Sequence, residues 1–150
     1  MVNNNNILLD APVTIGSIKL DTANLISCLS NKPGVELVVD EYSKSIIRTL
    51  IRESTEAITS YCNDTNQYDN IKLNDTFNFA RIMRNSFSHN YIFSFSNFYK
   101  NILNTRNISW NGNIIELALE GQPLEKTFFG YEDALKLFYD LREMIKNELS

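Results

Sequence analysis

The residues best suited to chemistry lie in one short stretch, Arg81–Tyr91, which reads RIMRNSFSHNY. On a helix that turns by about 100° per residue, five polar side chains fall within an arc of about 140°. These are Arg81, Arg84, Asn85, Ser88 and His89. The opposite face is apolar and carries Phe79, Ala80, Met83 and Phe87. Such a helix packs its apolar face on the domain and leaves the polar face for water or a ligand.

Two of these residue types suit work on a phosphodiester. Arginine offers a permanent fork of hydrogen-bond donors that matches phosphate, and histidine is the side chain whose ordinary pKa lies nearest neutrality. Arg84 and His89 together are the minimum needed to hold a phosphodiester and move a proton on it. The plain alternative is a helix face that only meets water, with His89 as a cation at the helix end.

The elements that must position this stretch form one mainly α domain, 1–150. An extended N-terminal segment, 1–20, is expected before a helical core, 21–150, with a loop over Asn63–Asn74. The expected helices are Asp21–Ser30, Val35–Tyr61, Asp75–His89, Phe93–Leu103 and Tyr131–Leu149. The expected apolar stripe of the second helix contains Val35, Val39, Tyr42, Ile46, Leu50, Ala57 and Tyr61, and that of the last contains Tyr131, Ala134, Leu135, Phe138, Leu141, Ile145 and Leu149.

Turn signals divide these helices. Asn31–Gly34 contains Pro-Gly, and Trp110–Asn113 contains Asn-Gly, the strongest short signal for a β-hairpin. A hairpin over about 108–120 is therefore expected, and Lys126–Phe129 is expected to add a short strand before the last helix.

The composition is ordinary for a soluble globular domain of 150 residues, with 43% hydrophobic and 21% charged residues. No apolar run reaches the length of a membrane span, and no basic, apolar leader begins the chain. Cys28 and Cys62 have no CxxC spacing and His89 is the single histidine, so neither a zinc site nor a disulfide framework is expected. A reducing cytoplasm is the expected location.

The net charge of −4 is unevenly distributed. Between Thr76 and Ile115 there is no Asp or Glu, whereas Arg81, Arg84, Lys100 and Arg106 are all present. This cationic window is also rich in aromatic residues, and such a stretch in an acidic protein is a candidate binding site. The other interpretation is a core helix pair with a few solvated arginines.

The segment Arg84–His89, RNSFSH, resembles the R-x4-6-H motif of HEPN domains, including the frequent Asn after the Arg. With Tyr91 it reads R-x4-H-x-Y, the form seen in HEPN toxins paired with minimal nucleotidyltransferase antitoxins. The resemblance implies a HEPN-like antiparallel helical bundle, here with a small β-hairpin before the C-terminal helix. The N-terminal segment and the Trp110 hairpin are departures from the minimal HEPN bundle.

The activity implied by the resemblance is a metal-independent endoribonuclease without a cofactor, which cuts single-stranded RNA by attack of the 2′-OH on the adjacent phosphate. No Asp/Glu/His cluster near the motif offers ligands for a metal mechanism. The reaction uses a base and an acid, and a two-fold homodimer would supply two copies of His89. Arg84 would bind the phosphate, Asn85 would orient His89 or contact RNA, and Ser88 would support the site.

Three further residues complete the hypothesis. Arg81 and Lys100 are expected to contact RNA, and Tyr91 is the expected target of a partner nucleotidyltransferase that transfers AMP to its hydroxyl. Two alternatives stay open: a non-catalytic HEPN-like module that binds a partner protein or nucleotide, and a structural helical domain that matches the motif by chance. A tyrosine that only packs its ring is the alternative for Tyr91.

Overall fold

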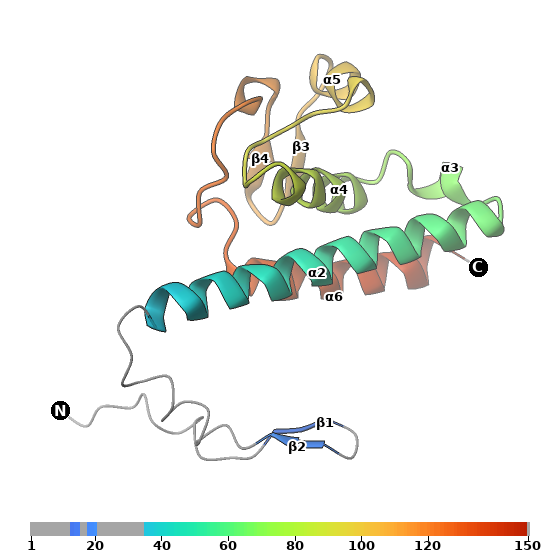
Figure 1. Cartoon of the computed structure of the whole chain (residues 1–150). Helices are drawn as coiled ribbons and strands as arrows, with labels where there is room; N and C mark the ends of the chain where they lie inside the picture. Colours follow the sequence, from blue (N-terminus) through green and yellow to red (C-terminus); the bar gives the residue numbers. More distant parts are fainter. Residues whose placement is uncertain (1–12, 16–17, 21–34, 150) are drawn as a thin grey trace. The chain divides into compact units, whose positions relative to one another are not determined.

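The computed structural model describes residues 13–15, 18–20 and 35–149, with side chains from residue 38 onward. The chain divides into two units, Met1–Tyr42 and Ser43–Ser150, with the boundary inside one long helix (Figure 1). In the first unit, β1 (Val13–Ile15) pairs antiparallel with β2 (Ile18–Leu20). The expected helix Asp21–Ser30 and the expected turn Asn31–Gly34 lie outside the described residues.

The second unit is mainly helical, as the sequence predicts. In chain order its elements are α2 (Val35–Asp64), which begins in the first unit, α3 (Tyr68–Ile71), α4 (Asp75–Ser88), α5 (Asn97–Leu103), β3 (Ile108–Trp110), β4 (Asn113–Ile115), the 3-10 helix η2 (Leu117–Leu119) and α6 (Tyr131–Glu148). The small hairpin before the C-terminal helix is therefore confirmed. No helix of the described residues is long and apolar enough to cross a membrane.

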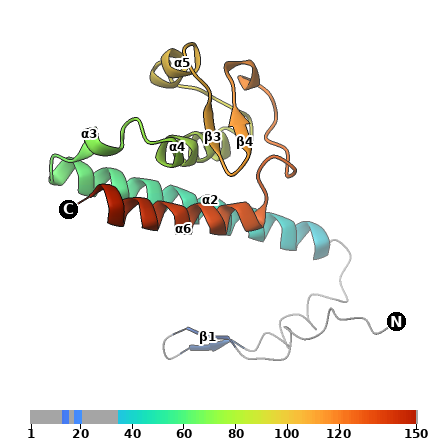
Figure 2. The same cartoon turned by 180° about the vertical axis from the view of Figure 1, so that it is seen from behind.

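The helix α4 runs opposite to α2. In the middle of α4, Arg81 donates to Tyr68, which follows the end of α2. Just beyond the end of α4, Tyr91 accepts a hydrogen bond from Arg48, which lies nearer the start of α2. By contrast, α2 and α6 run in the same direction, as Figures 1 and 2 show. The side chain of Asn70 in α3 contacts the carbonyl of Glu148 at the end of α6, which agrees with this direction.

Local sequence signals explain several boundaries. The helix α4 begins at Asp75, as expected, and is capped by the residue before it, because the Asn74 side chain accepts a hydrogen bond from the backbone N–H of Phe77 at 3.2 Å. In the hairpin, Asn111 and Gly112 have φ angles of +50° and +83°. Positive φ at both central residues is the requirement of the type I′ turn, which Asn-Gly satisfies.

Four expected elements differ from the structure. The expected loop Asn63–Asn74 contains α3, held by the fully buried Ile71, and the expected helix Phe93–Leu103 begins only at Asn97, after Ser96 caps it. The hairpin ends at Ile115 and a 3-10 turn replaces its expected continuation. The expected strand Lys126–Phe129 is a turn, in which the N–H groups of Phe128 and Phe129 both donate to Glu125.

The buried faces of the long helices also differ from expectation. Tyr42 and Ile46 of the expected stripe are exposed, and the helix instead buries Ile51, Thr55, Ile58 and Cys62. In α6 the buried face is Ala134, Leu137, Leu141 and Met144, while Leu135 and Phe138 are exposed. Both buried faces follow spacings of three and four, so the periodicity is helical as expected. The expected stripe of α2 misses the buried face, whereas that of α6 is right in part, since it contains the buried Ala134 and Leu141.

The helix α4 lies at the centre of the unit. Its apolar face is buried as expected, and Phe77 and Ile82, at the margins of the polar face, are fully buried as well. Phe79 contacts the rings of Trp110, Phe128 and Phe129 at centroid distances of 5.2, 6.3 and 5.9 Å. The hairpin is thus part of the core that holds the helix carrying the motif.

Candidate functional site

The motif lies at the C-terminal end of α4. The helix ends at Ser88, and His89 is its C-cap, with a backbone N–H that donates to the carbonyls of Asn85 and Ser86 at 3.1 Å. Asn90 and Tyr91 then adopt positive φ angles of +56° and +60°. Asparagine visits this region readily, whereas tyrosine does so at a cost, so the turn is held by its surroundings. It fixes where the side chains on either side of it lie.

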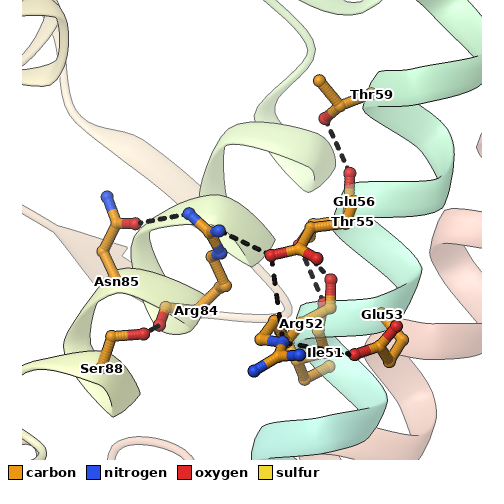
Figure 3. Close-up of polar contacts among 9 residues, drawn as sticks. All are labelled: Ile51, Arg52, Glu53, Thr55, Glu56, Thr59, Arg84, Asn85 and Ser88. Carbon is orange, nitrogen blue, oxygen red and sulfur yellow. Dashed lines mark hydrogen bonds and ion pairs between the residues drawn. The ribbon is translucent and has the colours of Figure 1, made fainter.

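The guanidinium of Arg84 bridges α4 and α2. Its NH2 group donates to the carboxylate of Glu56 at 2.7 Å, and its NH1 group donates weakly to the side-chain oxygen of Asn85 at 3.4 Å (Figure 3). The Nε atom is buried and has no hydrogen-bond partner. NH1 and NH2 each carry a second N–H, so donors remain for another acceptor.

The contact with Arg84 also changes the pKa of Glu56. The hydrogen bond and the charge of Arg84 hold the pKa of the Glu56 carboxyl below its usual range. The pair is therefore ionised at neutral pH, and it separates only as the pH falls through that lowered pKa. An anion that binds the Arg84 guanidinium must therefore compete with the Glu56 carboxylate for its N–H donors.

Arg81 lies one turn earlier in α4 and has no carboxylate partner among the described residues. It donates to the hydroxyl of Tyr68, and its guanidinium lies 5.6 Å from the ring of Phe77 and 5.9 Å from that of Tyr99. Burial raises the pKa of Tyr99 to about 12, so this ring stays neutral beside the cation. Contacts of this kind orient a guanidinium without neutralising its charge.

Together the two arginines line a polar pocket of about 380 Å³ between α4 and α2. The wall from α2 consists of Thr55, Glu56, Thr59, Ser60 and Asn63. Two guanidinium groups face one carboxylate, which leaves an excess of positive charge beside hydroxyl and amide groups. The pocket thus has the chemistry of an oxyanion site.

His89 does not line this pocket. Its side chain is exposed, and among the described residues the imidazole has no hydrogen-bond partner. The two expected supporting residues do not line the pocket either. Both contact Arg84: the Asn85 side-chain oxygen accepts from its guanidinium, and the Ser88 hydroxyl donates to its carbonyl at 3.1 Å. One chain therefore provides an anion pocket and a separate exposed imidazole, without joining them.

The cationic window is largely neutralised by acids from outside it. Lys100, an expected RNA contact, forms an ion pair with Glu120 at 3.1 Å, and Arg106 forms one with Asp75 at 2.5 Å. Most of the window's aromatic residues belong to the core, whereas Phe98 is exposed. The interpretation as a core helix pair is thus right for much of the window, and Arg81 is the exception.

Tyr91 is half-buried and packs against the core. Its ring lies 5.4 Å from the guanidinium of Arg48 and 5.8 Å from the ammonium of Lys44, and its hydroxyl accepts a long hydrogen bond of 3.4 Å from Arg48. The expected modification target therefore stands between two cations of α2.

Sequence reasoning missed the contribution of α2. Lys44, Arg48, Arg52 and Glu56 recur at intervals of four and so share one helix face, and this spacing was readable in the sequence. The sequence did not show that this face belongs to the site, because nothing near these residues indicates that the face meets α4. Among the described residues, no group of three or more His, Cys, Asp or Glu side chains gathers as metal ligands would.

Comparisons with protein-family models, curated proteins and solved structures gave no match to this chain. The resemblance to HEPN domains accordingly rests on the motif residues of the sequence.

Replacing Glu56 with glutamine is expected to tighten the binding of a non-cleavable single-stranded RNA several-fold, because the change removes the anion that competes for Arg84. The melting temperature should change little, since an exposed ion pair contributes about 0–1 kcal/mol. Fluorescence anisotropy and thermal melting measure the two effects. Asp75→Asn is the matched control, because it releases Arg106 in the same way. Equal or weaker RNA binding by Glu56→Gln would contradict competition at Arg84.

Proposed function

We propose that this chain is a metal-independent endoribonuclease of the HEPN type that cuts single-stranded cytoplasmic RNA without a cofactor. The observation that carries the proposal is that α4 contributes both arginines of a polar pocket and ends at the single histidine of the chain, whose side chain is exposed outside that pocket.

The proposed reaction is an internal transesterification. The 2′-oxygen attacks phosphorus, the bond from phosphorus to the 5′-oxygen breaks, and the products are a 2′,3′-cyclic phosphate and a 5′-hydroxyl. A base accepts the 2′-OH proton and an acid donates a proton to the 5′-oxygen. Arg84 stabilises the charge that builds on the non-bridging oxygens, and Arg81 supports it.

Two imidazoles are needed for this scheme and each chain has one. A homodimer whose two-fold axis passes close to Arg84 and His89 brings both histidines to one phosphate. The exposed position of His89, outside the pocket of its own chain, supports this arrangement. The rate is expected to fall at both acid and alkaline pH, because one imidazole must be neutral and the other protonated.

The direct test uses the purified protein, single-stranded RNA and EDTA. Cleavage that persists in the chelator and leaves 2′,3′-cyclic phosphate ends is the expected result. Loss of cleavage in EDTA with recovery on adding Mg²⁺, or products with 5′-phosphate ends, would overturn the mechanism.

The dimer makes a quantitative prediction for mixed subunits. A His89→Ala subunit paired with a wild-type subunit lacks either the acid or the base, so only wild-type pairs cut RNA. With equal amounts of the two subunits, exchanged to equilibrium, about a quarter of the dimers are wild-type pairs. Activity should therefore fall to about a quarter of that of the same total amount of wild-type protein, whereas subunits that act independently would keep about half. Activity assays on the mixtures measure this, and sedimentation should show a dimer at micromolar concentration. A monomer, or a linear decrease with the wild-type fraction, would contradict the shared site.

Tyr91 is the proposed point of control. A partner nucleotidyltransferase would transfer AMP from ATP to its hydroxyl: the tyrosine oxygen loses its proton and bonds to the α-phosphorus, and pyrophosphate leaves. This places a phosphodiester beside Arg48 and Lys44, where it competes with RNA phosphate. Tyr91→Phe should therefore remain an active nuclease that the partner enzyme does not silence. Mass spectrometry after co-expression measures the modification. An unchanged mass of the wild-type chain, or modification at another tyrosine, would contradict this control.

The second candidate function is a non-catalytic HEPN-like module that binds a partner protein or nucleotide. The ion pair between Arg84 and Glu56 favours it, because the guanidinium is already occupied by a group of the same chain. Under this function no RNA is cut, and His89→Ala leaves binding intact.

A further inference from the structure

A second and larger cavity, of about 700 Å³, lies at the same end of α4. Three segments line it: the α2 residues Lys44 and Ile47, the end of α4 with the turn that follows it, and the chain from Leu124 to Tyr131. Its volume lies in the range of sites that take small molecules or parts of larger ligands. The proposed cleavage reaction does not use this space, and of its lining residues only Tyr91 and Lys44 enter the proposed control.

The walls of this cavity are mostly apolar and rich in rings. Phe87 and Tyr91 come from the motif segment, and Phe129 and Tyr131 from the chain leading into α6. Phe87 lies 5.4 Å from Tyr91 and 6.0 Å from Phe129, measured between ring centroids. A set of rings from separate segments offers flat faces to a planar aromatic ligand, and nucleobases stack on such faces.

Two polar side chains at the cavity, Asn90 and Glu125, have no hydrogen-bond partner among the described residues. A carboxylate only accepts hydrogen bonds, and the amide of Asn90 offers an acceptor beside its donors. Both therefore suit a ligand with an amino group on the edge of its ring. Adenine, cytosine and guanine carry such a group and uracil does not.

The cavity and the two-arginine pocket are joined along one face of α2. Lys44 lines the cavity, Arg48 contacts Tyr91 in its wall, and Glu56 meets Arg84 in the pocket. Arg52 lies between them and pairs with Glu53 at 3.0 Å and with Glu56 at 3.9 Å. Steps of four residues advance about 6 Å along a helix, so cations recur between the two sites at intervals that suit a nucleic-acid backbone.

From this placement we propose that the cavity is a base-binding subsite, which takes a nucleobase with an exocyclic amino group from the single-stranded RNA held at Arg84. The phosphates between that base and the cut phosphodiester lie along Arg48 and Arg52. The proposal rests on the proposed function, since it assigns the cavity to the same substrate. It predicts that cleavage depends on the identity of a base near the cut, with uracil disfavoured.

The test uses 2′-O-methyl hexanucleotides, which bind but lack the attacking hydroxyl. The fluorescent probe is an oligoadenylate in which one base is replaced by 2-aminopurine, whose fluorescence falls when it stacks. Unlabelled oligoadenylate and oligouridylate are the two competitors. We expect quenching on the wild-type protein and displacement by oligouridylate that is about tenfold weaker than by oligoadenylate.

Three variants locate the effect. Tyr131→Ala should weaken binding about tenfold, whereas Tyr139→Ala, an exposed tyrosine of the same helix outside the cavity, should leave it unchanged. Asn90→Gly should remove most of the preference for adenine, and glycine suits the φ of +56° at this position, so the fold is retained.

Equal effects of Tyr131→Ala and Tyr139→Ala, or equal competition by the two oligonucleotides, would overturn the subsite. The nuclease is tested separately, because base binding in the cavity does not require His89. If quenching responds to Tyr131→Ala but RNA is never cut, the cavity binds a base and the proposed function fails. If RNA is cut without base preference, the proposed function stands and the base-binding subsite fails.

Discussion

Replacing His89 with alanine is expected to lower the rate of RNA cleavage by about 10²–10⁴-fold and to leave the melting temperature almost unchanged. The rate falls because the variant loses both the general base and the general acid of the proposed dimer. Stability is retained because the imidazole is exposed and bonds to none of the described residues. Its backbone N–H, which caps α4, is kept in the variant.

Arg84→Ala tests the other half of the site, with an expected loss of about 10²–10³-fold in rate from the missing stabilisation of the phosphorane charge. Arg106→Ala is its matched control. Both arginines reach from the cationic window to one carboxylate, Glu56 at 2.7 Å and Asp75 at 2.5 Å, with exposed side-chain fractions of 36% and 41%. The structural cost of the two changes is thus similar, and only one removes the anion pocket.

Rates and melting curves together decide between the open functions. Loss of cleavage in His89→Ala and Arg84→Ala, with Arg106→Ala active, is the result that the nuclease requires. Full activity of either site variant would contradict the assignment of the catalytic residues. Partial recovery in Arg84→Lys would indicate that charge matters, and the remaining deficit would measure the two-pronged geometry of arginine.

The sequence predicted the elements best where the signal is local. Asn111 and Gly112 specify their turn almost alone, because few other residue pairs accept two positive φ angles. The start of α4 at Asp75 was predicted correctly, but its capping residue was not. Asn74 and Asp75 are both good caps, and the choice depends on which side chain meets the N–H of Phe77. Boundaries of this kind are decided by geometry within one turn.

The sequence failed where the answer depends on a distant partner. Leu135 and Phe138 of α6 are as apolar as Leu137 and Leu141, yet only the last two are buried, because the position of α4 selects the face. The site shows the same limit. Arg84 and His89 were readable from their types and spacing, whereas Glu56 lies 28 residues before Arg84 and nothing around it marks it as a partner.

Replacing Trp110 with alanine is expected to destabilise the protein by about 3–5 kcal/mol, a large part of the 5–15 kcal/mol that is typical of a domain. The indole is nearly buried, with its ring 5.2 Å from Phe79 of α4 and 6.1 Å from Phe129. Its N–H donates to the carboxylate of Asp140 in α6 at 2.9 Å. The substitution therefore removes a large ring and leaves a cavity between the hairpin, α4 and α6.

Chemical denaturation and the melting temperature measure this effect, and Ile114→Ala is the control on the same hairpin, since Ile114 is 49% exposed and should cost little. If Trp110→Ala were as stable as Ile114→Ala, the hairpin would contribute nothing to the stability of the fold around α4. Because β3 packs on α4, we expect instead that the variant loses RNA cleavage through unfolding, with activity recovered at temperatures below its lowered transition. His89→Ala would not recover on cooling, and this contrast separates a residue that holds the helix from one that acts on the substrate.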